Sequence, residues 1–170
     1  GGVRSPGFVY GQSSGGEPAG DVTFGEAFTV QPFGNILKTL TLKAQDLKDV
    51  LEQQWNGCQI AGEPVQTVDR IMQISNGFSY VWNSTVPAAA CNRVKKMTFN
   101  GSVIYDESLG GFQLPVTAAT TYQVTVNDFM SSGGDGFTVL KKGANPIGGG
   151  QDLDALVAYF SQFKAPNPAY

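Results

Sequence analysis

Two Asn-Gly dipeptides, Asn76-Gly77 and Asn100-Gly101, constrain the fold more than any other feature of the sequence. Asn-Gly favours positive φ at both central positions of a two-residue turn, so each pair predicts a tight β-hairpin. Strand-like segments flank both pairs: residues 70–74 and 78–82 around the first, and residues 94–99 and 103–105 around the second. The middle of the chain is therefore predicted to form antiparallel sheet.

Patterns on either side of these hairpins define the fold class. Residues 44–55 place apolar side chains at three- and four-residue spacing, with polar residues on the other face, and so predict an amphipathic helix. The other expected elements are a Thr23-capped helix over 24–28, strands over 36–43, 122–126 and 137–140, a loop over 141–151, and a helix over 152–163. This order predicts an α+β fold with a mixed or antiparallel sheet, in one domain over residues 1–170.

The composition excludes several classes of function. The chain has no histidine, so a Ser-His-Asp triad or a histidine-bearing metal site cannot be built from it. Its net charge of −3 offers no basic surface for a nucleic-acid polymer. No apolar run reaches the roughly 18 residues that a membrane helix needs, so no membrane span is predicted. The chain begins at Gly1-Gly2 without an initiating Met, and we expect it to be a processed or excised piece of a longer protein.

Cys58 and Cys91 lie in separate predicted loops. Two cysteines fit one disulfide better than a metal site, which would need more ligands, and a bridge would indicate an oxidising compartment. Two free buried thiols are the alternative.

Several short motifs favour structure over chemistry. Gly148-Gly149-Gly150 precedes a helix as a phosphate-binding loop would, but it lacks the Gly-Lys-Ser/Thr ending, and Asp152 and Asp154 would repel a phosphate. Asn83-Ser84-Thr85 and Asn100-Gly101-Ser102 match the glycosylation acceptor pattern, which also occurs by chance. Asp128 can cap the turn that follows the strand over 122–126.

The loop after that strand combines an aromatic ring with a carboxylate. Phe129 and Asp135 share it, and Gly133, Gly134 and Gly136 leave its backbone free to take positive φ. Together with Arg4 and Asn76, these residues would suit a nucleotide: arginine for phosphate, an aromatic face for the base, and an amide and a carboxylate for hydroxyls or base edges. The simpler alternative is a tight turn with Phe129 in the core.

Longer motifs resemble one family in sequence and order. They are Gly1-Gly2-Val3-Arg4, Gly20-Asp21-Val22-Thr23-Phe24, Val30-Gln31-Pro32-Phe33-Gly34-Asn35, Met72-Gln73-Ile74-Ser75, residues 122–129, Gly133-Gly134-Asp135-Gly136-Phe137, and residues 152–159. Through them the chain resembles the C-terminal substrate-binding domain of the 5′-nucleotidase and UDP-sugar hydrolase family over nearly its whole length.

The resemblance implies a domain that binds a nucleotide or nucleoside for an exported phosphohydrolase. It would work beside an N-terminal metallophosphatase domain that is not on this chain and that holds two divalent metals, in an extracellular, periplasmic or cell-surface location. No cofactor is expected on this chain, and no catalytic residue. Phe129 resembles one wall of a base clamp, Asp135 the ribose-binding carboxylate, Gly134 a backbone contact in the same loop, Arg4 a phosphate or ribose ligand, and Asn76 a base ligand.

The resemblance breaks at the second wall of the clamp. The family has an aromatic residue near Met72-Gln73-Ile74-Ser75, whereas Ile71 and Ile74 are aliphatic here, so Ile74 or Phe78 is expected to take this place. Two other readings stay open: a non-catalytic binding or interaction module that keeps the fold, and a domain of a related phosphodiesterase for cyclic nucleotides.

Overall fold

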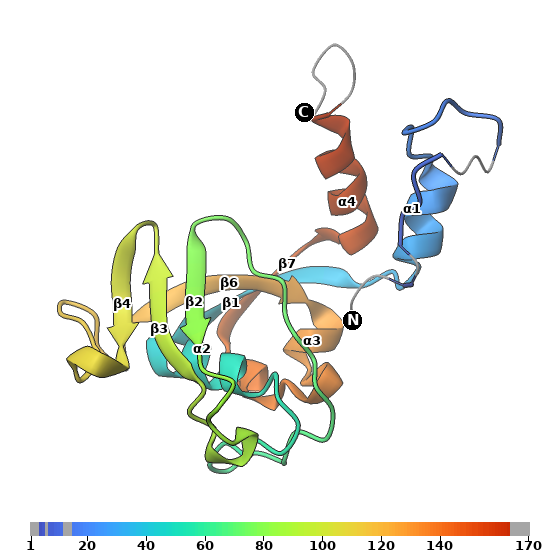
Figure 1. The fold of residues 1–170 in the computed structure, drawn as a ribbon. Coiled ribbons are helices and arrows are strands. Elements are labelled where there is room, and N and C mark those ends of the chain that lie inside the picture. Colours follow the sequence, from blue (N-terminus) through green and yellow to red (C-terminus); the bar gives the residue numbers. More distant parts are fainter. Residues whose placement is uncertain (1–3, 6, 12–14, 164–170) are drawn as a thin grey trace.

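Two antiparallel sheets and four α-helices make up the computed structural model, which describes residues 4–5, 7–11 and 15–163 (Figure 1). The helices are α1 (Phe24–Val30), α2 (Ala44–Glu52), α3 (Asp128–Ser131) and α4 (Asp152–Ser161). The strands are β1 (Ile36–Lys43), β2 (Phe78–Trp82), β3 (Val94–Phe99), β4 (Ser102–Asp106), β5 (Gly111–Phe112), β6 (Thr121–Asn127) and β7 (Ala144–Gln151). This architecture confirms the α+β prediction. None of the helices described is long and apolar enough to cross a membrane.

The smaller sheet has the order β6-β1-β7, with β1 paired antiparallel on both sides. β1 has the bounds predicted from its β-branched residues, and it buries Leu40 and Leu42. Helices α1 and α4 lie beyond the end of this sheet, away from the other elements (Figure 1). Phe8, in the segment before α1, makes an edge-on contact with Phe160 of α4, with ring centroids 5.1 Å apart.

The larger sheet has the order β2-β3-β4-β5 and contains the second predicted hairpin. Asn100 (φ 46°) and Gly101 (φ 78°) both have positive φ between β3 and β4, as a type I′ turn requires. The first hairpin prediction was wrong. Residues 70–74 form no strand, and β2 pairs with β3 instead. The reason is that the backbone N–H groups of Arg70 and Met72 donate to Gln54, which removes them from any ladder.

Helix α2 lies between two apolar clusters. Val50 packs with Leu42 and Phe137 in one cluster, and Leu51 packs with Trp55 and Met97 in the other. The helix starts at the predicted residue but ends at Glu52, three residues before the predicted end at Trp55. The expectation of an apolar face opposite a polar face also fails at the helix end, where Glu52, Gln53 and Gln54 are all buried. Burying them is acceptable only because each is hydrogen-bonded.

The segment after the candidate loop differs from its prediction. Residues 138–142 form 3₁₀ turns that bury Val139 and Leu140, so the expected strand over 137–140 is absent. The expected loop over 141–151 is wrong from residue 144 on, because Ala144–Gln151 form β7, an exposed strand at the sheet edge. An edge strand tolerates proline and glycine because one side of its backbone needs no partner. Gly148-Gly149-Gly150 therefore lies in this strand.

Local signals predicted the starts of α1 and α4 correctly. Thr23 Oγ1 accepts from the Glu26 N–H at 3.2 Å and Glu26 Oε2 accepts from the Thr23 N–H at 2.8 Å, which completes a capping box before α1. Helix α4 begins at Asp152, as predicted, and Asp152 is tied to Asn35 by two hydrogen bonds.

Candidate functional site

The candidate loop is anchored at its first residues. Asn127 ends β6, and its side-chain oxygen accepts from the Met130 N–H at 2.8 Å, so Asn127 and not Asp128 caps the short helix α3. Asp128 has a different task, because its carboxylate accepts from the Ile36 N–H at 3.1 Å and thereby fastens α3 to the start of β1. Phe129 therefore projects from a short helix that is held by the rigid smaller sheet.

Phe129 packs against Gly134 and is otherwise largely open. A Cβ atom added at Gly134 would lie 2.5 Å from Phe129 Cε1, so the ring covers the glycine at a distance that no other residue type allows. The ring nevertheless stays 45% exposed, so Phe129 is not a core residue. An aromatic ring fixed in this way offers solvent-accessible π surface.

Asp135 stands next in the loop in a left-handed conformation. Its φ is 55°, and Gly133 (86°) and Gly136 (84°) in the same loop also have positive φ. Aspartate tolerates this region better than most residues. Its carboxylate lies 3.5 Å from the Arg70 Nε, with 26% of the Asp135 side chain and 48% of the Arg70 side chain exposed. Sequence reasoning missed Arg70, because it was assigned to a strand and its partner lies 65 residues further along the chain.

Gln66 holds the backbone of this loop through a hydrogen bond to Asp135. Its buried Nε2 donates to the carbonyl of Asp135 at 3.0 Å and to the carbonyl of Gln53 at 2.7 Å. A Cβ at Gly136 would lie 2.5 Å from Gln66 Oε1, so the second glycine of Gly-Asp-Gly makes room for this amide. The two glycines thus serve different neighbours: Gly134 admits the Phe129 ring, and Gly136 admits Gln66.

Gln53 fixes the turn that follows the loop. Its Nε2 donates to Thr138 Oγ1 at 2.8 Å, and its Oε1 accepts from the Val139 N–H at 3.1 Å. A hydrogen bond between the Thr138 side chain and the Glu63 carboxyl lowers the pKa of that carboxyl, and the ammonium group of Lys142 lowers it further. Glu63 is therefore held ionised 3.3 Å from Lys142 Nζ, which ties the 58–66 loop to the same turn.

Gln54 fixes the backbone at Arg70 and Met72. Its Oε1 accepts from the Met72 N–H at 2.8 Å and from the Tyr80 O–H at 3.2 Å, while its backbone carbonyl accepts from the Arg70 N–H at 2.8 Å. Sequence analysis placed Gln53 on the polar face of the helix and assigned no role to Gln54 or Gln66. The sequence shows that Glu52, Gln53 and Gln54 are polar but not that they are buried, so it does not indicate a buried polar network here.

The remaining predicted residues fall into separate surroundings. Ile74 and Phe78 both line an apolar cavity of about 540 Å³ that lies between the two sheets and also touches Met72, Tyr122 and Val124. Asn76 is exposed in the turn before β2. Arg4 donates its N–H to the Val30 carbonyl and places its guanidinium 5.5 Å from the Phe33 ring centroid. The structure thus joins Phe129 to Gly134 and sets Ile74 beside Phe78 around one cavity, while Arg4 is held by residues at the end of α1 and after it.

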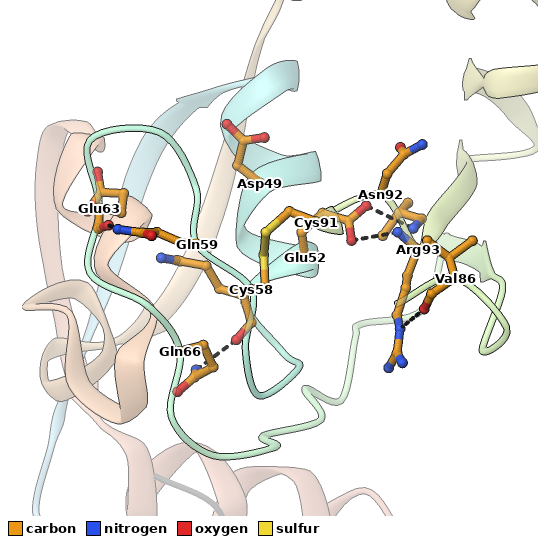
Figure 2. Close-up of a disulfide and its surroundings, with 12 residues drawn as sticks. Asp49, Glu52, Cys58, Gln59, Glu63, Gln66, Val86, Cys91, Asn92 and Arg93 are labelled. Atoms are coloured by element: carbon orange, nitrogen blue, oxygen red, sulfur yellow. Dashed lines mark hydrogen bonds between the residues drawn. A yellow bond between two sulfur atoms is a disulfide. The ribbon is translucent and has the colours of Figure 1, made fainter. Parts of the chain in front are cut away.

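The disulfide between Cys58 and Cys91 is formed, with Cα atoms 5.1 Å apart. Figure 2 shows the bridge joining the loop of Gln59, Glu63 and Gln66 to the segment of Asn92 and Arg93. The Gln66 N–H donates to the Cys58 carbonyl at 2.8 Å, so the bridge also anchors the loop that carries this glutamine. The closed stretch of chain contains Arg70 and the whole 70–76 segment.

The described part of the chain offers no metal centre. No group of three or more His, Cys, Asp or Glu residues that could hold an ion occurs among the residues described. Asp135 and Arg70 are oppositely charged neighbours, which suits hydroxyl and phosphate groups of an organic ligand better than a cation.

Comparison with known protein families gives one match over most of the chain. The family described as "5'-nucleotidase, C-terminal domain" matches residues 2–142. This stretch contains β1, α2, both hairpin strands of the larger sheet and the complete candidate loop.

Individual relatives agree with this match and are much longer. Endonuclease YhcR of Bacillus subtilis is 30% identical over 149 residues, which are 86% of this chain and 10% of that protein. Cell wall protein Lmo0130 of Listeria monocytogenes is 28% identical over 145 residues, 85% of this chain and 16% of that protein. The crystal structure of the 5′-nucleotidase precursor from Thermus thermophilus superposes with a TM-score of 0.62 and 32% identity, over 86% of this chain and 26% of that one. The chain therefore spans about a quarter or less of the length of these proteins.

Proposed function

The chain belongs to the 5′-nucleotidase C-terminal domain family, and from this membership we propose that it binds a nucleoside 5′-phosphate or nucleotide sugar. It positions that ligand for hydrolysis by a separate metallophosphatase domain. The observation that carries the proposal is the Phe129 ring, which rests on Gly134 and is 45% exposed beside the Asp135 carboxylate.

The chemistry of this loop suits the nucleoside part of a ligand. A base stacks on the open Phe129 ring, a contact worth roughly 1 to 3 kcal/mol per base. The ribose hydroxyls donate to the Asp135 carboxylate, whose loop is held at fixed backbone geometry by Gln66. Arg70 lies 3.5 Å from the Asp135 carboxylate, and its guanidinium supplies hydrogen-bond donors to ligand oxygens. Asn76 offers an amide to the base edge, and Arg4 is assigned to the phosphate or ribose.

The second wall of the base site is assigned to the 70–78 stretch. Ile74 and Phe78 supply apolar surface there, and both border the 540 Å³ cavity. Isoleucine gives contact without a stacked π face, so affinity depends mainly on Phe129.

Hydrolysis itself is assigned to the other domain. The described residues do not fit a metal pair, and the two divalent metals belong to the metallophosphatase domain, where they would activate water and stabilise the phosphoryl transition state. This chain supplies orientation, which lowers the barrier by holding the reacting group in place. The length of the relatives supports a multidomain parent protein.

Export of the parent protein is part of the same proposal. The Cys58–Cys91 disulfide is typical of oxidising compartments, and one relative is a cell wall protein. These observations support an extracellular, periplasmic or cell-surface location.

Calorimetric titration of the purified chain with AMP, UDP-glucose and adenosine tests the proposal. We expect binding of at least one of them, abolished or strongly weakened by Phe129→Ala. The matched control is Phe24→Ala, which removes another exposed phenylalanine, located on α1. Absence of binding to all three ligands by the intact fold would favour the interaction module over the nucleotide-binding domain.

A further inference from the structure

Three buried glutamines, Gln53, Gln54 and Gln66, form a cluster whose hydrogen bonds converge on the candidate site. They are 1%, 0% and 3% exposed. We propose that Gln54 and Gln66 are positioning residues, which together with Gln53 set the separation of the 70–76 segment from the 134–139 segment across the ligand site. This inference rests on the proposed function.

Burying an amide side chain has a free-energy cost. An unpaired buried polar group costs roughly 1 to 3 kcal/mol, so an apolar residue would fill these positions more cheaply if packing were the only requirement. No described buried side-chain nitrogen or oxygen lacks a hydrogen-bond partner. The glutamine cluster therefore satisfies its amides by binding other parts of the chain, and the identity of those parts indicates its role.

Gln54 and Gln66 each hydrogen-bond to one of the two segments. Gln54 accepts from the Met72 N–H at 2.8 Å through its side chain and from the Arg70 N–H at 2.8 Å through its backbone. Gln66 donates to the Asp135 carbonyl at 3.0 Å. None of the strands in the described part of the chain pairs with either segment.

Gln53 connects the two segments. Gln66 Nε2 also donates to the Gln53 carbonyl at 2.7 Å, and Gln53 is the neighbour of Gln54 in the chain. A continuous path of hydrogen bonds and one peptide link thus runs from Asp135 through Gln66 and Gln53 to Gln54 and Met72. Arg70 belongs to one segment and Asp135 to the other, so the 3.5 Å distance between Arg70 Nε and the Asp135 carboxylate depends on this path.

The test replaces single amides with methionine, which has a similar length and no hydrogen-bonding amide. In Gln54→Met and Gln66→Met, we expect AMP affinity to fall by about tenfold, in line with the loss of the hydrogen bond that each side chain makes to Met72 or to Asp135. Amide hydrogen exchange of residues 70–76 and 134–139 should accelerate, while exchange in β3 and β4 stays as in the wild type. Gln59→Met is the matched control, because Gln59 lies in the same loop with an exposed side chain.

Two further variants separate positioning from stability. Tyr80→Phe removes the second donor to Gln54 Oε1 and leaves the Met72 bond in place, so it should lower the melting temperature without changing AMP affinity by more than about twofold. Gln54→Glu keeps the acceptor for the Met72 N–H and loses the donor to the Leu51 carbonyl. Its AMP affinity should therefore be near that of the wild type, unlike that of Gln54→Met, even where the melting temperature is reduced.

The outcomes are distinguishable. Wild-type affinity in both methionine variants, or an equal loss of affinity in Tyr80→Phe, would overturn the positioning role. If Gln54→Met does not fold, Gln66→Met and Gln54→Glu decide the question. If the wild-type chain binds no nucleotide, the proposed function fails, and hydrogen exchange decides the positioning role alone: unchanged exchange in both segments refutes it, and faster exchange in both supports it.

Discussion

Gly134→Ala is the sharpest test of the Phe129 surface, because it displaces the aromatic ring while Phe129 itself stays unsubstituted. The new Cβ would lie 2.5 Å from Cε1 and 2.6 Å from Cδ1 and Cζ of Phe129. Carbon atoms pack at about 3.5 to 4.0 Å, so the ring must move by roughly 1 Å or more. Gly134 does not have positive φ, so alanine introduces no backbone strain of its own.

The expected effect on stability is small, and the expected effect on binding is large. The ring is 45% exposed and can swing outward at little cost, while alanine restricts the unfolded chain and offsets part of that cost, so the change in unfolding free energy should stay within about 1 kcal/mol. Displacing the ring removes a stacking contact of roughly 1 to 3 kcal/mol, which weakens the dissociation constant for AMP about 5- to 150-fold.

The assay is calorimetric titration of AMP, with thermal unfolding measured on the same samples. Gly148→Ala is the matched control, since a Cβ there has no atom within 4 Å and the position lies in β7. A double-mutant cycle with Phe129→Ala completes the test, because Gly134→Ala should cost nothing further once the ring is gone. The reasoning is refuted if Gly134→Ala binds AMP as tightly as the wild type while Phe129→Ala does not, or if the two losses add.

Three other predictions address the scaffold. Replacing Cys58 and Cys91 with serine should lower the unfolding free energy in urea by roughly 3 to 4 kcal/mol, since the bridge spans 33 residues; equal stability with and without the bridge would contradict this. Gly136→Ala should cost at least about 1 to 2 kcal/mol in thermal unfolding, because its φ is 84°; a wild-type melting temperature would refute it. The Ser108 hydrogen bond lowers the pKa of Asp106 below its usual 3.8. The stability that Asp106 contributes is therefore present above pH 3.8 and is lost as pH falls through its lower folded pKa, a loss that Asp106→Asn should remove from unfolding curves recorded between about pH 2 and 5.

Elements that depend on local signals could be predicted from the sequence. The Thr23–Glu26 capping box fixed the start of α1, and the β-branched run fixed both ends of β1. The Asn100-Gly101 turn requires positive φ at two adjacent residues, and the structure has it. In each case the information lies within a few residues.

Elements that depend on distant partners could not be predicted. Residues 70–74 have the composition of a strand, but Gln54, a residue outside any sheet, takes the N–H groups of Arg70 and Met72. The same holds for Arg70 at the candidate site, because no local pattern places it beside Asp135. By contrast, the close approach of Phe129 to Gly134 arises within six consecutive residues, and the loop as a whole could be recognised from its glycines.

The end of α2 explains why the candidate site lies where it does. Glu52 is the last residue of α2, and Gln53 and Gln54 follow it in a turn. These three consecutive polar side chains reach three different parts of the fold. Glu52 accepts from the N–H groups of Arg93 and Val94 and thereby holds the start of β3. Gln53 holds the turn at 138–139, and Gln54 holds Met72.

These three side chains give a specific reason for burying polar groups beside two apolar clusters. Glu52 also pairs with buried Lys48 at 3.0 Å, so its charge is compensated and its removal would leave an unpaired buried ammonium, a change that typically costs about 3 to 5 kcal/mol. A helix end that must hold the larger sheet and both segments of the candidate site at once cannot be apolar, because the groups it holds are backbone N–H groups that need acceptors. The polar run Glu52-Gln53-Gln54 is therefore required by the segments whose N–H groups it accepts, and Gln53 and Gln54, adjacent at one helix end, hold the two halves of the candidate site.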